Sequence, residues 1–189
     1  MKTHHNYLGN ILITIFLLAT LLMAGCKGAE TTTTTGTTKS ELAYTLITGG
    51  DKGGSPYLSE DAQIRIITDN KLATEITDMM TSDSTDPLLK VDYTHYFVIA
   101  AFNGWRGNLY NSFQIQYVEQ IGNTILITAT FNDLSIGITP ATFIPAYSSQ
   151  YQAVQLDRSI FPKTGTLTFK LLDENGTERA STIATFVNK

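Results

Sequence analysis

Residues 96–102 read Tyr-Phe-Val-Ile-Ala-Ala-Phe, an uninterrupted apolar run in the middle of the 189-residue chain. A strand that is buried on one face alternates apolar and polar residues, whereas a strand that is buried on both faces reads as a continuous apolar run. The run therefore predicts a central β-strand, and the other elements are predicted around it.

The segments that flank this run alternate in the manner of strands with one buried face. Phe113, Ile115 and Tyr117 alternate with Gln114, Gln116 and Val118, and the turn signal Gly122-Asn123 separates them from a second alternating segment at 125–131. This pattern predicts a hairpin whose one face is buried. Asn175-Gly176 predicts a further hairpin, and the remaining strand candidates are residues 42–47, 63–67, 151–156, 167–171 and 180–187.

One segment has helical rather than strand periodicity. Leu72, Ile76, Met79 and Met80 fall on one helical face, and Thr68 or Asp69 can cap the helix that carries them. Residues 81–87 end in Pro87 and are expected to break it. We therefore expect a mainly β (α+β) fold with a single packed helix near residues 69–80. Its antiparallel sheets form a sandwich, or one coiled sheet carries the helix.

Composition excludes several classes of protein. The formal net charge of −4 and the pI of about 5.3 argue against a nucleic-acid-binding protein, which needs a concentrated basic surface. Hydrophobic residues make up 42% of the chain and charged residues 16%, so the sequence is too apolar for a disordered protein. The single cysteine excludes a disulfide framework and a multi-cysteine zinc site.

The N-terminus carries the features of an export signal. Lys2 precedes an apolar run over residues 11–23, which is short for a membrane-spanning helix but has the length of a signal-peptide core. The run ends in Leu22-Met23-Ala24-Gly25-Cys26, which resembles the lipobox of bacterial lipoproteins. This resemblance implies cleavage between Gly25 and Cys26 and acylation of Cys26, for example by palmitate. An uncleaved membrane anchor with an incidental cysteine is the alternative.

The chain therefore divides into three predicted parts. Residues 1–25 are the signal peptide, and residues 26–41 are the acylated cysteine and a Thr-rich tether, since residues 30–40 contain no apolar residue that could be buried. Residues 42–188 form a single β-rich domain. The lipid would hold the domain outside the cytoplasm, on the cell membrane or the outer membrane.

Catalytic and metal sites find little support in the sequence. His95 is the one histidine that follows Cys26, it precedes the apolar run, and no Gly-x-Ser-x-Gly motif accompanies it, so we interpret it as a structural histidine. Residues 83–86 and 173–176 supply oxygen ligands but lack the spacing of a calcium loop, and we interpret both as turns. The glycine pairs at 49–50 and 53–54 are read as parts of a flexible loop rather than as a phosphate cradle. We expect no metal and no cofactor.

The loop at 103–110 is the strongest candidate for partner contact. It reads Asn-Gly-Trp-Arg-Gly-Asn-Leu-Tyr and contains the only tryptophan of the chain. Trp, Tyr and Arg are enriched at the centres of protein interfaces, which makes Trp105, Arg106 and Tyr110 the predicted contact residues. Local packing of Trp105 against the sheet, or stacking of its ring on a sugar, are the alternatives.

The stretch from Gln63 to Asp157 resembles the C-terminal domain of the PrcB family of protease-complex subunits. The resemblance rests on the strand at 96–101 followed by Phe102-Asn103-Gly104, on Tyr110 to Ile115, and on Tyr147 to Val154. Two motifs depart from the family pattern. Residues 111–113 are Asn-Ser-Phe where the family has Gly-Gly-Tyr, and residues 149–151 are Ser-Gln-Tyr where it has Ser-Pro-Tyr.

The resemblance implies a non-catalytic lipoprotein accessory that binds and stabilises a cell-surface protease, and it transfers no catalytic residue. The partner would be such an extracytoplasmic protease or another envelope protein. A carbohydrate- or peptidoglycan-binding β module that uses Trp105 is the first alternative. A hydrolase with an unrecognised site near His95 is the second.

Overall fold

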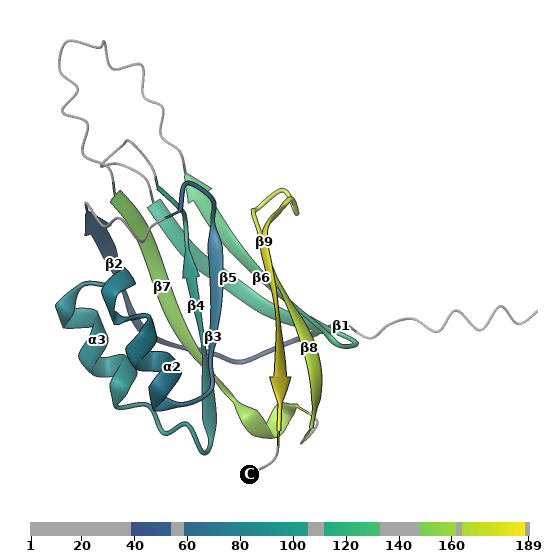
Figure 1. Ribbon diagram of the computed structural model, residues 1–189. Helices are drawn as coiled ribbons and strands as arrows, with labels where there is room; N and C mark the ends of the chain where they lie inside the picture. The colour runs from purple at the N-terminus through teal and green to yellow at the C-terminus, as the bar shows by residue number, and fades with distance from the viewer. Residues whose placement is uncertain (1–38, 54–58, 106–111, 133–147, 162–163, 188–189) are drawn as a thin grey trace, which may run out of the picture. The chain divides into compact units, whose positions relative to one another are not determined.

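Two β-sheets face each other and form the core of the fold (Figure 1). The structure is a computed structural model that describes residues 39–53, 59–105, 112–132, 148–161 and 164–187. The proposed signal peptide, Cys26 and the tether up to residue 38 lie outside the described residues. Within the described ranges, no helix has the length and hydrophobicity needed to cross a membrane.

The five-stranded sheet has the order β1-β5-β6-β8-β9, and the four-stranded sheet has the order β2-β7-β4-β3. Neighbouring strands are antiparallel except for β6 and β8, which run parallel. The prediction of a mainly β fold with antiparallel sheets is confirmed, in its sandwich form. The strands are β1 (Lys39–Glu41), β2 (Thr45–Gly53), β3 (Gln63–Ile67), β4 (Tyr96–Phe102), β5 (Ser112–Ile121), β6 (Thr124–Asn132), β7 (Ser148–Asp157), β8 (Gly165–Leu172) and β9 (Glu178–Phe186).

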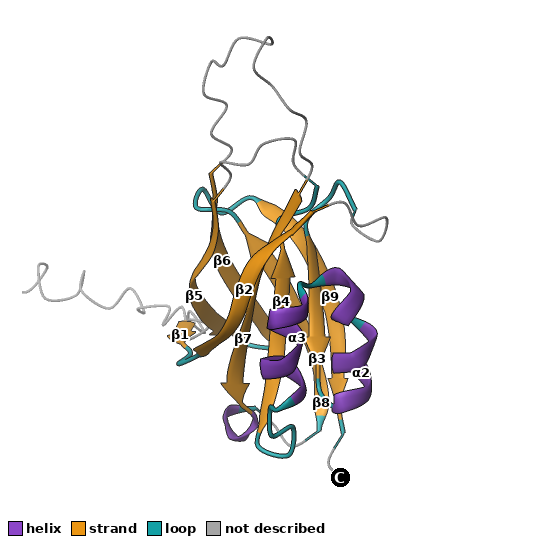
Figure 2. Cartoon of the chain, turned by 90° about the vertical axis from the view of Figure 1, so that its left-hand side faces the viewer, coloured by secondary structure: helices purple, strands orange, loops and turns teal. Residues whose placement is uncertain are grey.

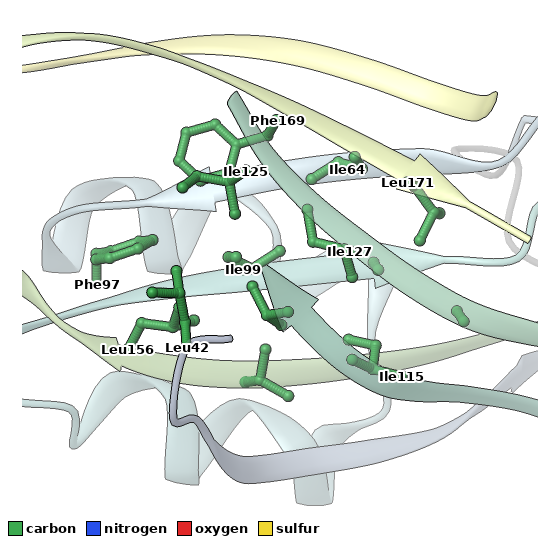
Figure 3. Close-up of a cluster of buried hydrophobic side chains, with 14 of the residues drawn as sticks. Leu42, Ile64, Phe97, Ile99, Ile115, Ile125, Ile127, Leu156, Phe169 and Leu171 are labelled. Carbon is green, nitrogen blue, oxygen red and sulfur yellow. The ribbon is translucent and has the colours of Figure 1, made fainter. Parts of the chain in front are cut away.

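Strand β4 is buried on both faces, as its apolar run predicts. Phe97 and Ile99 point into the main core between the sheets, while Val98 and Ala100 belong to a second buried cluster on the opposite face. Figure 3 shows the main core, in which Phe97 and Ile99 meet side chains of the five-stranded sheet such as Ile127. Each fully buried aliphatic or aromatic side chain of this kind contributes about 1.5–3 kcal/mol to the hydrophobic driving force.

Helical segments cover the outer face of the four-stranded sheet (Figure 2). Helix α2 (Asn70–Glu75) begins at Asp69, whose carboxylate accepts a hydrogen bond from the Leu72 N–H at 2.9 Å, so the predicted cap is confirmed. A 3-10 turn, η1 (Thr77–Met79), follows it. Residues 70–80 thus form the predicted helical segment, although its backbone changes from α to 3-10 geometry at Ile76.

The segment expected to break the helix forms a second one, α3 (Ser82–Leu89), and that expectation was wrong. Pro87 lies in its second half, where it removes one donor from a helix of only two turns. Tertiary contacts compensate for this loss. Leu88 is fully buried in the second cluster, and the Ser84 hydroxyl lies in a buried group of hydroxyls.

This hydroxyl cluster fastens α3 to the sheet. It consists of the side-chain hydroxyls of Thr48, Thr81, Ser84 and Tyr151. The Tyr151 hydroxyl lies 2.7 Å from Ser84 Oγ and 2.7 Å from Thr81 Oγ1, and it accepts a hydrogen bond from the Thr81 N–H at 3.0 Å. Thr48 on β2 donates to Ser84 Oγ at 2.8 Å. Since Tyr151 and Ser84 are both buried, the cluster satisfies polar groups that would otherwise cost free energy.

The β5–β6 hairpin forms as predicted, with Gly122 at a positive φ in its turn, but one side chain faces the other way. A β-bulge between Ile115 and Tyr117 shifts the alternation by one residue. Tyr117 is therefore exposed and Val118 is buried, which corrects the prediction that Tyr117 shares the face of Phe113.

Two segments predicted as tether or loop are strands. Lys39–Glu41, placed in the tether by composition, pairs with β5 and forms an ion pair between Lys39 and Glu119 at 2.8 Å. Gly49, Gly50 and Gly53 belong to β2 rather than to a loop, and they pair with β7. A Cβ on Gly50 would lie 2.8 Å from the Tyr151 hydroxyl, so the small residue makes room for the hydroxyl cluster.

Candidate functional site

A groove of about 370 Å³ opens beside β3, between β9 and the helical segment that follows β3. Aliphatic side chains dominate its lining. The lining residues are Ile64, Arg65, Ile66 and Ile67 from β3, Leu72, Glu75, Ile76 and Met79 from the helical segment, and Thr182, Ile183 and Ala184 from β9.

The groove presents apolar surface to solvent. The Ile183 side chain is 68% exposed, and Leu72 and Ile66 are half-buried. Arg65 and Glu75 are exposed and place one charge of each sign on its rim. The groove therefore presents one exposed aliphatic side chain, Ile183, beside half-buried aliphatic neighbours and a charged rim, a combination that can serve in protein contact.

The two strands that line the groove are also the last strands of their sheets. Among the described residues, β3 pairs with β4 alone, and β9 pairs with β8 alone. The outer edge of such a strand presents unpaired N–H and C=O groups, which can pair with an added strand. The nine residues of β9 contain no proline, and its charged residues, Glu178 and Arg179, both lie at its beginning. The groove thus combines an aliphatic lining with two strand edges that pair with no other strand in the described part of the chain.

Ile183 is the one trace of this surface in the sequence pattern of β9. In β9, Arg179, Ser181 and Thr185 are exposed and alternate with more buried positions. Ile183 occupies the exposed set although it is strongly apolar. Single exposed aliphatic residues are common on protein surfaces, so this position by itself does not identify the groove, and the alternation does not show what lies beside it.

Trp105 lies just beyond the end of β4, and its side chain is half-buried. The main-chain N–H of Trp105 donates to the Ser59 carbonyl at 2.8 Å. Gly104 has a φ of 80°, and a Cβ there would lie 2.5 Å from the Glu60 carbonyl oxygen, so glycine is required for this close approach. The other two predicted contact residues, Arg106 and Tyr110, and the processing residues Gly25 and Cys26 lie outside the described residues.

His95 lies in an exposed turn before β4. Its Nδ1 is 2.8 Å from Asp92 Oδ2 and 3.0 Å from Thr94 Oγ1. Hydrogen bonds from the Thr94 hydroxyl and from His95 lower the pKa of Asp92 to about 2. This cluster links three side chains that are close in sequence, and its groups face solvent, so its hydrogen bonds serve the local turn.

The oxygen-rich segments predicted as turns differ from each other. Asp173 begins the β8–β9 turn, and its carboxylate accepts hydrogen bonds from the Asn175 and Thr177 N–H groups at 2.9 and 2.8 Å. The turn interpretation is therefore right for this segment. Residues 83–86 belong to α3 instead, as described above. Nowhere in the described ranges do three or more His, Cys, Asp or Glu side chains gather in a group that could hold a metal ion.

Comparison with known proteins identifies no relative. A scan against protein-family models, a search of curated proteins and a search of solved structures each found no match.

Proposed function

We propose that this protein is a membrane-anchored, extracytoplasmic lipoprotein without catalytic activity, which binds a partner protein through the groove between β3, β9 and α2. The groove is the observation that carries the proposal. Its aliphatic lining supplies hydrophobic contact area, and the unpaired edges of β3 and β9 can hydrogen-bond an extended segment of the partner.

The lipobox-like segment that ends at Cys26 supports the anchoring part of the proposal. An acyl chain contributes about 0.8 kcal/mol of membrane affinity for each buried CH₂ group. A binding protein held in the plane of a membrane meets its partner at a high local concentration, so a modest groove suffices for stable association.

Two observations favour binding over catalysis. His95 lies in an exposed turn with Asp92 and Thr94, whereas a general base must be held beside a nucleophile in a site that excludes water. The groove itself is lined by aliphatic residues and contains one carboxylate, Glu75, and one guanidinium, Arg65. The resemblance of residues 63–157 to the PrcB family makes a cell-surface protease the first partner to test.

Crosslinking in native membranes tests this function. The full-length lipoprotein is compared with Ile183→Glu and with Thr185→Glu, which places the same charge on the same strand but outside the groove. We expect Ile183→Glu to reduce capture of the partner at least ten-fold and to leave the melting temperature unchanged, because the side chain is 68% exposed. Equal capture by all three proteins would contradict the proposal.

Glycan binding is a second candidate, and the half-buried Trp105 at the end of β4 is the observation that favours it. An aromatic ring with one accessible face can stack on a sugar. Sedimentation with purified peptidoglycan separates the two functions. Retention that depends on Trp105 and is unaffected by Ile183→Glu would favour the glycan-binding function.

A further inference from the structure

Two amide oxygens are buried without a hydrogen-bond partner where β4 ends and β7 begins. These are Asn103 Oδ1 and Gln150 Oε1, and the Asn103 side chain is only 1% exposed. Leaving a buried polar group unsatisfied costs about 1–3 kcal/mol. Native structures satisfy the large majority of such groups with protein or water partners, so these two neighbouring oxygens are available to a ligand.

The two amides are neighbours on the same face of the four-stranded sheet. The Asn103 N–H donates to the Gln150 carbonyl at 2.8 Å, which places the two residues side by side. Asn103 continues the alternation of β4 on the side of Ala101, which faces the main core. The Gln152 side chain accepts from the Ile115 N–H on the opposite sheet, so Gln150, two residues away, also faces that sheet.

A carboxylate lies next to them in the same row. Asp51 on β2 is the direct partner of Gln150, and its neighbour Gly50 faces the Tyr151 hydroxyl on the helical side. Asp51 therefore lies on the inter-sheet side of β2, at an exposed position. Its Oδ2 also accepts a hydrogen bond from the Ser148 hydroxyl at 3.0 Å. Three adjacent strands thus bring one carboxylate, two amide oxygens and a hydroxyl to one end of the sandwich.

We propose that this row, formed by Asp51, Gln150 and Asn103, binds a hard divalent cation, Ca²⁺. The donor set consists of oxygen alone, whereas zinc and copper sites use nitrogen or sulfur ligands. Carboxylate and amide oxygens coordinate Ca²⁺ at 2.3–2.6 Å in flexible geometry, while Mg²⁺ demands a near-ideal octahedron. A single carboxylate gives the weak, millimolar-class affinity of extracellular calcium modules.

Thermal unfolding of the full-length lipoprotein in detergent tests the site, with CaCl₂, MgCl₂ and EDTA as the compared additions. At a Ca²⁺ concentration ten times the dissociation constant, the melting temperature should rise by about 3–6 °C. Mg²⁺ at the same concentration should produce a much smaller rise. No rise with Ca²⁺, or an equal rise with Mg²⁺, overturns the proposal.

Single substitutions distinguish a loss of Ca²⁺ binding from a loss of folding. Asp51→Asn should lower the Ca²⁺ affinity at least ten-fold, whereas Asp86→Asn, the same change at an exposed position of α3, should leave it unaltered. Gln150→Glu adds a second carboxylate to the row. It should lower the melting temperature in EDTA and raise the Ca²⁺ affinity, a gain that an unfolded variant cannot produce. The proposal is also overturned if Gln150→Glu gains no Ca²⁺ affinity, or if Asp86→Asn loses as much Ca²⁺ affinity as Asp51→Asn.

Discussion

Tyr151→Phe removes one oxygen from the centre of the hydroxyl cluster and leaves the aromatic ring in place. The ring packs against Phe102 at a centroid separation of 5.8 Å, and this contact survives the change. The hydroxyl is 2.7 Å from both Ser84 Oγ and Thr81 Oγ1, and it accepts from the Thr81 N–H at 3.0 Å. The substitution therefore isolates the polar contribution of the cluster.

The expected loss follows from what each partner retains. Ser84 keeps the hydroxyls of Thr48 and Thr81, so it remains satisfied. The Thr81 N–H loses the hydrogen bond to Tyr151, and a buried or half-buried donor without a partner costs about 1–3 kcal/mol. In a domain of this size, 1 kcal/mol corresponds to about 2–4 °C, so the melting temperature should fall by about 2–12 °C.

Urea unfolding followed by circular dichroism measures this change in the free energy of unfolding. Tyr93→Phe is the matched control, since its half-buried hydroxyl makes one hydrogen bond, to the Leu88 carbonyl at 3.0 Å. Its loss should cost about 0.5–1.5 kcal/mol, less than that of Tyr151→Phe. If Tyr151→Phe proved as stable as the wild type, the cluster would not hold α3 to the sheet.

Four further outcomes are expected. Cys26→Ala should leave an unprocessed precursor without fatty acid, as judged by mass and by palmitate labelling; unchanged labelling would remove the lipoprotein proposal. His95→Ala should abolish no activity of the purified protein. The melting temperature of this variant should change little, because the hydrogen bonds of His95 lie in an exposed turn. A hydrolytic activity that is lost specifically in this variant would contradict the expectation. Trp105→Ala should cost less than the roughly 3–5 kcal/mol of a fully buried tryptophan, since its side chain is half-buried. Denaturant unfolding measures this cost, and a loss as large as that of a buried tryptophan would contradict the expectation. Burial raises the pKa of Tyr93 to about 12 from 10.0, so its contribution to stability is complete below pH 10 and is lost as the pH rises from 10 to 12. Unfolding across this range should show a larger loss in the wild type than in Tyr93→Phe, which retains the smaller effect of Tyr44, whose pKa burial also raises.

The strands could be predicted well because their signals are local. The run at 96–102 and the short strand at 63–67 have the predicted bounds, and both hairpin turns contain the predicted glycines at positive φ. These features depend on alternation and turn chemistry, which a chain segment carries within itself. The errors at Lys39–Glu41 and in β2 have a common cause. Polar or glycine-rich segments form strands there because a neighbouring strand supplies their hydrogen bonds.

The bulge beside Tyr117 and the helix α3 were missed for a similar reason. A bulge changes which face a side chain takes, and no rare residue marks it in the sequence. Helix α3 contains Pro87 and several residues of low helix propensity, and it is held by the burial of Leu88 and by the hydroxyl cluster. Tertiary contacts override propensity at both places.

By itself, the sequence determined the class of fold, the central strand, the hairpins and the cap of the first helix, because each depends on residues that are near one another in the chain. Tertiary structure alone decided which strands end each sheet, and therefore that β3 and β9 lie beside each other and form a groove with α2. It also brought Asp51, Asn103 and Gln150 into one row. These residues are distant in sequence, and the order of strands in a sheet depends on which partners bury the most surface together. Alternation within one strand does not encode that choice.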